Sequence, residues 1–163
     1  MKPVIAVYPG TFDPITLGHE DIVRRAAELF DQVIVAVAVA HHKKTLFTLD
    51  ERMDMVREVF VDMPSIQAQP FSGLTRDFVR QHQAKVMVRG VRSMTDFDYE
   101  LQLAGMNRHL MADVETIFLA PQARFQAISS TLVREIAMLG QPSDTQGLVS
   151  PSVHQRLLSK KSG

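Results

Sequence analysis

The sequence contains no cysteine and no tryptophan, and its charges cancel. Without cysteine there is no disulfide, no zinc–thiolate site and no thiol nucleophile. The 18 basic side chains are matched by 18 acidic ones, which argues against a nucleic-acid-binding surface, because such surfaces need a basic excess. No apolar run is long enough to span a membrane, and the N-terminus lacks the apolar stretch of a signal peptide. We therefore expect a cytoplasmic protein with neither nucleic-acid nor membrane partners.

The chain instead alternates short apolar runs with segments of helical periodicity. A length of 163 residues, 45% of them hydrophobic, suits a single domain spanning residues 1–163. Strands are expected over residues 4–7, 33–40, 65–71, 85–89 and 114–120. Helices are expected over residues 18–30, 48–60, 74–83 and 95–111, then from 130 or 131 to about 140, and briefly after Ser150-Pro151, before a frayed tail over 159–163.

This alternation predicts an α/β fold of the Rossmann-like, doubly wound type. The unbroken β-branched run over residues 33–40 is typical of a parallel strand buried on both faces. The run over 65–71 is interrupted by glutamines, as in an edge strand. Right-handed crossovers then favour a five-stranded parallel sheet in the order 3-2-1-4-5. Ligands of such sheets bind beyond the carboxyl ends of the strands, where the strand order reverses.

The stretch from Tyr8 to His19 joins the first strand to the first helix, and its residue types suit an anion site. Gly10 and Gly18 allow a ligand to approach the backbone closely, and a helix N-terminus attracts anions. His19, in the first helical turn, can donate to a phosphate oxygen. Taken alone, Asp13-Pro14 is common turn punctuation and a single histidine is more often a surface residue. Their combination on one strand–turn–helix favours phosphate binding.

Further polar runs follow the other strands. His41–Lys44 follows the second strand, Arg89–Arg92 closes the fourth, and Phe125–Thr131 follows the fifth. Cations and helix N-termini gathered at one sheet edge in a neutral protein favour a polyanionic small molecule. Simpler readings exist, because 41–44 also suits a solvated loop and Ser129-Ser130-Thr131 suits a plain helix cap. A metal site at His41 and His42 is disfavoured, since adjacent side chains at a strand end point opposite ways.

Two motifs resemble those of a known superfamily. G-T-F-D-P followed by T-x-G-H is similar to the signature of the nucleotidyltransferases related to class I aminoacyl-tRNA synthetases, and I-S-S-T-x-x-R ending at Arg134 completes that pattern. The block Asp96–Glu100, Gln102–Ala104 and Met106–Arg108 resembles the bacterial phosphopantetheine adenylyltransferases more specifically. The resemblance covers nearly the whole chain.

Three positions depart from that family. The family usually carries prolines around its lysine loop, where this chain has His42 and Thr45, and a tryptophan near position 125, where this chain has Phe125. The resemblance implies transfer of AMP from ATP, accompanied by Mg²⁺, to 4'-phosphopantetheine, giving dephospho-coenzyme A and pyrophosphate by in-line attack without a covalent intermediate. It also implies a homohexamer and feedback inhibition by coenzyme A.

Two other functions remain open from the sequence. A sister nucleotidyltransferase would act on nicotinamide mononucleotide or an alcohol phosphate, but such enzymes lack the D-F-x-Y-E…Q-L-A block. A nucleotide-sensing module would bind ATP without turnover, which the presence of His19, Lys43 and Arg89 disfavours.

The resemblance also implies roles for individual residues. Catalytic roles fall to Thr11, His19, Lys43 and Arg92. ATP contacts fall to Thr11, Phe12, His19, Gly90, Val91, Arg92, Glu100, Phe125, Gln126, Ala127, Ile128, Ser129, Ser130 and Thr131. Acceptor contacts fall to Thr11, Lys43, Thr75 and Arg89. In this scheme His19 stabilises charge at the α-phosphate, Lys43 and Arg89 hold the acceptor phosphate, no side chain is a metal ligand, and Asp13 has no assigned role.

Overall fold

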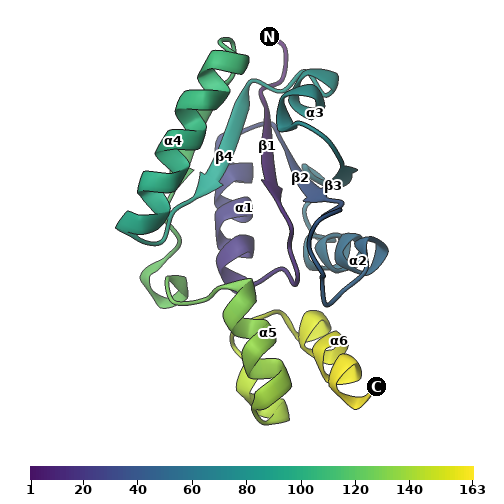
Figure 1. The fold of residues 1–163 in the computed structure, drawn as a ribbon. Helices are drawn as coiled ribbons and strands as arrows, with labels where there is room; N and C mark the ends of the chain where they lie inside the picture. Colours follow the sequence, from purple (N-terminus) through teal and green to yellow (C-terminus); the bar gives the residue numbers. More distant parts are fainter.

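The computed structural model covers residues 1–163. They fold into a parallel sheet flanked by helices (Figure 1). The strand order is β3-β2-β1-β4-β5, which confirms the expected fold. The strands are β1 (Ile5–Gly10), β2 (Gln32–Ala38), β3 (Ile66–Phe71), β4 (Val86–Gly90) and β5 (Glu115–Leu119). The helices are α1 (Leu17–Leu29), α2 (Leu49–Val59), α3 (Thr75–Gln81), α4 (Met94–Leu110), α5 (Ser130–Leu139) and α6 (Pro151–Ser162), with short 3₁₀ turns at Ala123–Phe125 and Pro142–Thr145. No helix is both long and apolar enough to cross a membrane.

Alternating side chains of the central strands supply two cores, one on each face of the sheet. Ala6 and Tyr8 of β1 belong to the larger core, which contains the inner residues of α1, α2, α5 and α6. Val7 belongs to the smaller core, with Phe78 of α3 and Met111 at the end of α4. The run Val33–Val37 of β2 is buried throughout, as expected for a strand covered on both faces.

Element ends differ from the sequence expectation by one to three residues. β1 continues to Gly10 because it pairs with β2 as far as Val37. Ser93, rather than Thr95 or Asp98, caps α4, and Ser129, rather than Ser130 or Thr131, caps α5. The capping box that opens α2 at Thr48 is confirmed.

The C-terminal tail is helical, whereas the sequence predicts fraying. α6 runs to Ser162, and two of its side chains bind α2. Arg156 Nη2 lies 2.5 Å from Glu58 Oε1, and Lys160 Nζ lies 3.0 Å from Glu51 Oε1. These ion pairs hold the last helix against α2.

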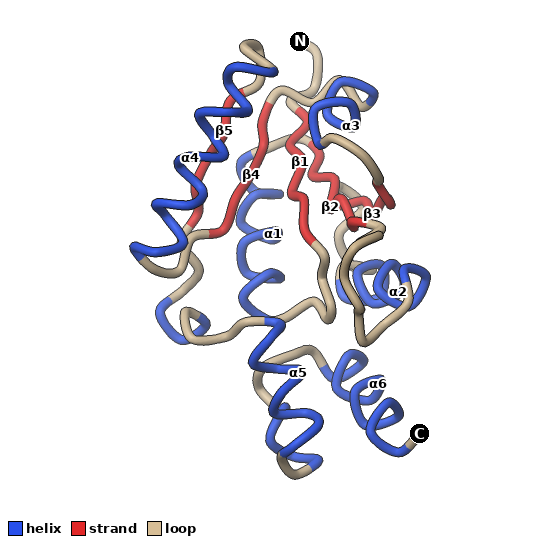
Figure 2. The backbone as a smooth tube through the Cα atoms, viewed as in Figure 1, coloured by secondary structure: helices blue, strands red, loops and turns tan.

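The sheet opens where its strand order reverses. β1 pairs with β4 only at Ala6–Val86 and Val7–Met87, although β1 continues to Gly10 and β4 continues to Gly90. The two strands therefore part toward their carboxyl ends, which Figure 2 shows between β1 and β4. α5 and α6 lie beyond these ends (Figure 1), so the opening faces the N-terminus of α5.

Candidate active site

A cavity of about 400 Å³ occupies the opening between β1 and β4. It is bounded by the ends of both strands and by the first turns of α1 and α5. The site residues proposed from the sequence that line it are Thr11, Phe12, His19, Arg89, Gly90, Arg92, Glu100, Ile128, Ser129, Ser130 and Thr131. The structure thus brings together residues that lie up to 120 positions apart.

Two helix N-termini face this cavity with backbone amides that have no acceptor in the protein. These are the amides of Gly18 in α1 and of Ser130 and Thr131 in α5. The first turn of a helix leaves such N–H groups unpaired, and the helix dipole adds partial positive charge. Both helix ends are therefore suited to bind phosphate oxygens.

His19 is held in one orientation by the cap of its own helix. The Thr16 amide donates to His19 Nδ1 at 3.0 Å, while Thr16 Oγ1 accepts from the His19 amide at 3.4 Å. Burial, aided by the charge of Arg92, lowers the pKa of His19 to about 4. Because Nδ1 accepts a hydrogen bond in this neutral imidazole, the proton resides on Nε2. His19 thus offers an N–H donor from Nε2 at neutral pH.

The Phe12 ring packs against the His19 imidazole. Its ring meets the His19 ring edge-on at 5.1 Å and the Tyr8 ring at 5.5 Å. Phe12 adopts a left-handed backbone conformation, with φ of 52°, which is uncommon for a residue other than glycine. Its ring is buried, so Phe12 shapes the cavity mainly through its backbone and through its contact with His19.

Both arginines of the cavity are paired with carboxylates from α4, which the sequence analysis did not anticipate. Arg89 binds Glu100 through Nε and Nη2, each at 2.6 Å. Arg92 Nε lies 3.2 Å from Asp96 Oδ2, and Arg92 Nη1 donates to the Ile128 carbonyl. Arg92 therefore links the start of α4 to the loop before α5, across the rim of the cavity.

A second cavity of about 210 Å³ adjoins the first. The two share the wall formed by Pro9, Gly10, Thr11 and Arg89. The remaining lining of the second cavity is mainly apolar, with two polar side chains: Ala38, Phe71, Met87 and Leu103, then Thr75 and Asn107. Two ligands bound side by side would thus meet at Thr11 and Arg89.

Comparisons with known proteins agree with this arrangement. A family model described as cytidylyltransferase-like matches residues 7–136. A phosphopantetheine adenylyltransferase from Acidovorax sp. (strain JS42) is 64% identical over 160 residues, which cover 98% of this chain and 96% of that protein. The chain belongs to the phosphopantetheine adenylyltransferase family. The enzyme of that name from Bordetella avium (strain 197N) is 55% identical over 157 residues, covering 96% of this chain and 93% of the relative.

Solved structures with the same fold are more distant in sequence. A Plasmodium falciparum nicotinic acid mononucleotide adenylyltransferase complexed with NaAD is 14% identical, with a TM-score of 0.74, and covers 97% of this chain and 96% of its own. A lipopolysaccharide core biosynthesis protein from Thermoplasma volcanium GSS1 is 19% identical, with a TM-score of 0.58, and covers 74% of this chain and 98% of its own. These likenesses support the fold alone.

Several residues that the family resemblance singled out line neither cavity. Lys43 lies on an exposed loop, and the Val91 amide donates to Leu119 at the edge of the sheet. Phe125 packs against the larger core beneath the Arg124 guanidinium. Gln126 and Ala127 are exposed in the loop that leads to α5. Thr75 is different, because it lines the second cavity although not the first.

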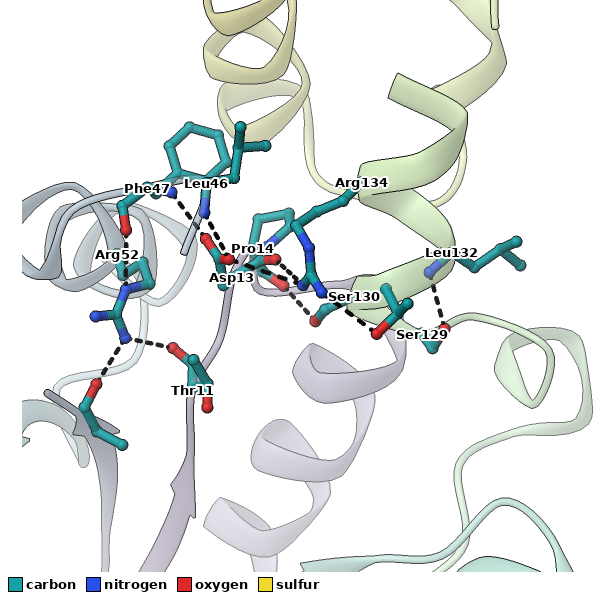
Figure 3. A network of polar contacts seen from close by, with 12 residues as sticks. Thr11, Asp13, Pro14, Leu46, Phe47, Arg52, Ser129, Ser130, Leu132 and Arg134 are labelled. Atoms are coloured by element: carbon teal, nitrogen blue, oxygen red, sulfur yellow. Dashed lines mark hydrogen bonds and ion pairs between the residues drawn. The ribbon is translucent and has the colours of Figure 1, made fainter. Parts of the chain in front are cut away.

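Arg134 and Ser130 have a structural role that the sequence did not reveal: their side chains bind backbone carbonyls of the turn after β1. Ser130 Oγ donates to the Pro14 carbonyl at 2.8 Å, and Arg134 Nη1 donates to the Asp13 carbonyl at 2.6 Å (Figure 3). These bonds fix the N-terminus of α5 against the turn that follows β1. The motif ending at Arg134 was a signal that this residue matters, but the motif does not indicate a backbone carbonyl as its partner.

No group of three or more histidine, aspartate or glutamate side chains lies close enough together to hold a metal ion. The carboxylates of Asp96 and Glu100, which line the larger cavity, are each engaged by an arginine.

Proposed function

We propose that this protein transfers the adenylyl group of ATP to 4'-phosphopantetheine, yielding dephospho-coenzyme A and pyrophosphate in coenzyme A biosynthesis. The observation that carries the proposal is the pair of adjoining cavities that share Thr11 and Arg89. Relatives up to 64% identical are named phosphopantetheine adenylyltransferase. A two-substrate reaction needs this kind of arrangement, because its rate depends on holding both reactants in contact.

ATP would occupy the larger cavity. The unpaired amides of Gly18, Ser130 and Thr131 and the Arg92 guanidinium suit the phosphates of a nucleotide. The Nε2–H of His19 faces the same cavity and would donate to the α-phosphate. Donors fixed before the reaction stabilise developing charge effectively, because they need no reorganisation when that charge appears.

4'-Phosphopantetheine would occupy the smaller cavity. Its apolar walls at Phe71, Met87 and Leu103 suit the carbon chain of the acceptor, and Thr75 offers a hydrogen bond to one of its amides. The phosphate end would then reach Thr11 and Arg89, at the wall shared with the nucleotide. Lys43 would complete the charge around this phosphate from the neighbouring exposed loop.

The reaction would need no protein nucleophile and no general base. A phosphate monoester has a second pKa of about 6, so the acceptor is mostly a dianion at neutral pH. One acceptor oxygen would attack the α-phosphorus in line, the bond from that phosphorus to the bridging oxygen would break, and pyrophosphate would leave with the electron pair. Positioning and charge neutralisation would therefore supply the rate enhancement.

Three further properties belong to the same proposal. Mg²⁺ would enter as part of the Mg·ATP substrate and keep mostly phosphate and water ligands, and the location would be cytoplasmic.

A homohexamer is supported by apolar side chains of α4 that are more than half exposed: Met94, Tyr99, Leu101 and Met106. Light scattering would then give six times the mass of one 18.3 kDa chain, and a monomer would contradict the assembly.

The direct test mixes purified protein, Mg·ATP and 4'-phosphopantetheine and quantifies the products by chromatography. We expect dephospho-coenzyme A and pyrophosphate in equal amounts, and no product with pantetheine, which lacks the attacking phosphate. Pyrophosphate released without an adenylylated acceptor would contradict the proposal. His19→Ala, in which we expect kcat to fall by about 10²–10³-fold, is the low-activity comparison.

A further inference from the structure

A buried arginine joins three backbone segments beside Thr11. The Arg52 side chain, in α2, is almost wholly enclosed, with 1% of the residue exposed. Its Nη1 donates to the carbonyls of Thr11 and Ala38 at 2.8 and 2.7 Å, and its Nε donates to the Phe47 carbonyl at 3.3 Å (Figure 3). Ala38 ends β2 and Phe47 precedes α2, so Arg52 holds both ends of the connecting loop.

Asp13 holds the same loop from the opposite side. Its carboxylate accepts from the Leu46 amide at 2.8 Å and from the Phe47 amide at 2.9 Å. Figure 3 shows both bonds converging on the turn that follows β1. The Asp13 residue is 3% exposed, and charge-assisted bonds to buried backbone amides are strong. Asp13 therefore ties the loop to the same turn that carries Thr11.

These bonds leave only a short arc of the loop without anchors. The Val39 amide also donates to the Phe71 carbonyl, so the arc lies between Val39 and Leu46, and its exposed residues are His41, His42, Lys43 and Lys44. Both ends of the arc are fixed to the turn of Thr11 and Asp13. The positions open to the Lys43 side chain are therefore centred on that turn. Burying an arginine and an aspartate is costly, and apolar residues often stabilise a core equally well. Here the buried Arg52 and Asp13 bind backbone groups at both ends of this arc.

We propose that Asp13 and Arg52 are positioning residues that hold the Lys43 loop against Thr11, and thereby set where the acceptor phosphate is bound. The inference rests on the proposed function, in which Lys43 and Thr11 contact that phosphate. It assigns no chemical step to Asp13 or Arg52, because both are enclosed by protein. Arg52 donates to backbone carbonyls only, and the Asp13 carboxylate accepts from two backbone amides and lies 3.8 Å from Arg134 Nη1.

Kinetics of Asp13→Asn test this role. The two amides bind different carboxylate oxygens, and asparagine replaces one of these oxygens with an NH2 group, which cannot accept a hydrogen bond. We expect KM for 4'-phosphopantetheine to rise while KM for ATP stays near the wild-type value, with a loss in kcat/KM of up to about 10²-fold, as a displacement of about 1 Å can cause. Arg52→Lys, which cannot reach all three carbonyls, should behave alike.

A double-mutant cycle with Lys43→Ala separates positioning from general destabilisation. If Asp13 acts through Lys43, then adding Asp13→Asn to Lys43→Ala should cause little further loss for the acceptor. Additive losses, or an equal rise in KM for ATP, would overturn the proposal. Arg24→Lys is the matched control, because Arg24 also donates to a backbone carbonyl, that of Val59, but lies away from the loop; its kinetics should remain those of the wild type.

Hydrogen exchange without substrate distinguishes a failure of this inference from a failure of the proposed function. In Asp13→Asn, the Leu46 and Phe47 amides should exchange faster than in the wild type, while amides of the central strands stay protected. Unchanged exchange at both amides would overturn the proposal that Asp13 holds the Lys43 loop, regardless of which acceptor the enzyme uses. Faster exchange in a protein that cannot adenylylate 4'-phosphopantetheine would support the positioning role of Asp13 but contradict the proposed acceptor.

Discussion

Arg89 and Glu100 form a bidentate ion pair, with both hydrogen bonds at 2.6 Å, at the wall between the two cavities. A third bond runs from Arg89 Nη1 to the Pro9 carbonyl. Burial lowers the pKa of Arg89, but the hydrogen bonds and charge of Glu100 more than offset this effect and raise it. The guanidinium is therefore permanently charged and fixed in one plane, with N–H groups still free for a ligand.

Removing the charge of Glu100 should destabilise the fold. Glu100→Gln leaves Arg89 largely enclosed, with 25% of its side chain exposed, and without a countercharge. We expect the free energy of unfolding to fall by about 3 kcal/mol, the lower end of the cost of breaking a buried ion pair. Urea denaturation measures it. Asp54→Asn, in a pair with Arg57 that is more than half exposed, should cost less than about 1 kcal/mol; equal losses would contradict this account.

Replacing His19 should affect turnover far more than folding. His19→Ala removes one donor aimed at the α-phosphate, and loss of such a donor typically lowers kcat by about 10²–10³-fold. KM for ATP and the circular dichroism spectrum should change little. His109→Ala, at an exposed histidine outside both cavities, is the control. Wild-type turnover in His19→Ala would remove His19 from its role.

The pH dependence follows from the lowered pKa of His19, about 4 in the free folded protein against an ordinary value of 6.5. Between these values the unfolded chain binds a proton that the folded protein does not. The contribution of His19 to stability is thus complete above about pH 6.5 and decreases as the pH falls toward 4. NMR titration should show a neutral imidazole protonated at Nε2 from pH 5 to 8. A midpoint near 6.5 would show that the site does not exclude the charged form.

The Thr16 hydroxyl should matter for stability and, less strongly, for rate. Thr16→Ala removes the oxygen that caps α1, which typically costs about 1 kcal/mol. Thr16 Oγ1 also lies 3.1 Å from His19 Nδ1, so kcat should fall, but less than in His19→Ala because the backbone donor to Nδ1 remains. Thr16→Ser should restore both properties. Failure of serine to restore stability would mean that the methyl group, and not the cap, is what matters.

The sequence predicts the fold well because burial alone specifies it. The unbroken apolar run over 33–40 is typical of a central parallel strand, and right-handed crossovers leave few possible strand orders. The location of the site is predictable for a related reason, since the carboxyl ends of parallel strands meet at one edge. Helix ends were displaced by a residue or two because several serines and threonines stand near each start, and any of them can cap a helix.

The partners of the charged residues could not be predicted in this way. Arg52 binds the carbonyl of Thr11, which is 41 positions away, and a backbone carbonyl leaves no trace in residue type. The family resemblance implies that Glu100 contacts the nucleotide; Glu100 lines the larger cavity and also pairs with Arg89, a partner that the sequence did not indicate. Neither partnership follows a local spacing rule such as i to i+4. Only the folded arrangement shows which charges face a ligand and which hold the site together.

The most direct test of the central claim is acceptor selectivity, measured as kcat/KM at matched Mg·ATP. The acceptors are 4'-phosphopantetheine, dephosphorylated pantetheine and nicotinamide mononucleotide. This account predicts a strong preference for 4'-phosphopantetheine and an almost inert dephosphorylated form, which lacks both the attacking oxygen and the charge that Arg89 and Lys43 would bind. A higher kcat/KM for nicotinamide mononucleotide would contradict the acceptor assigned here while leaving the nucleotidyltransferase fold intact.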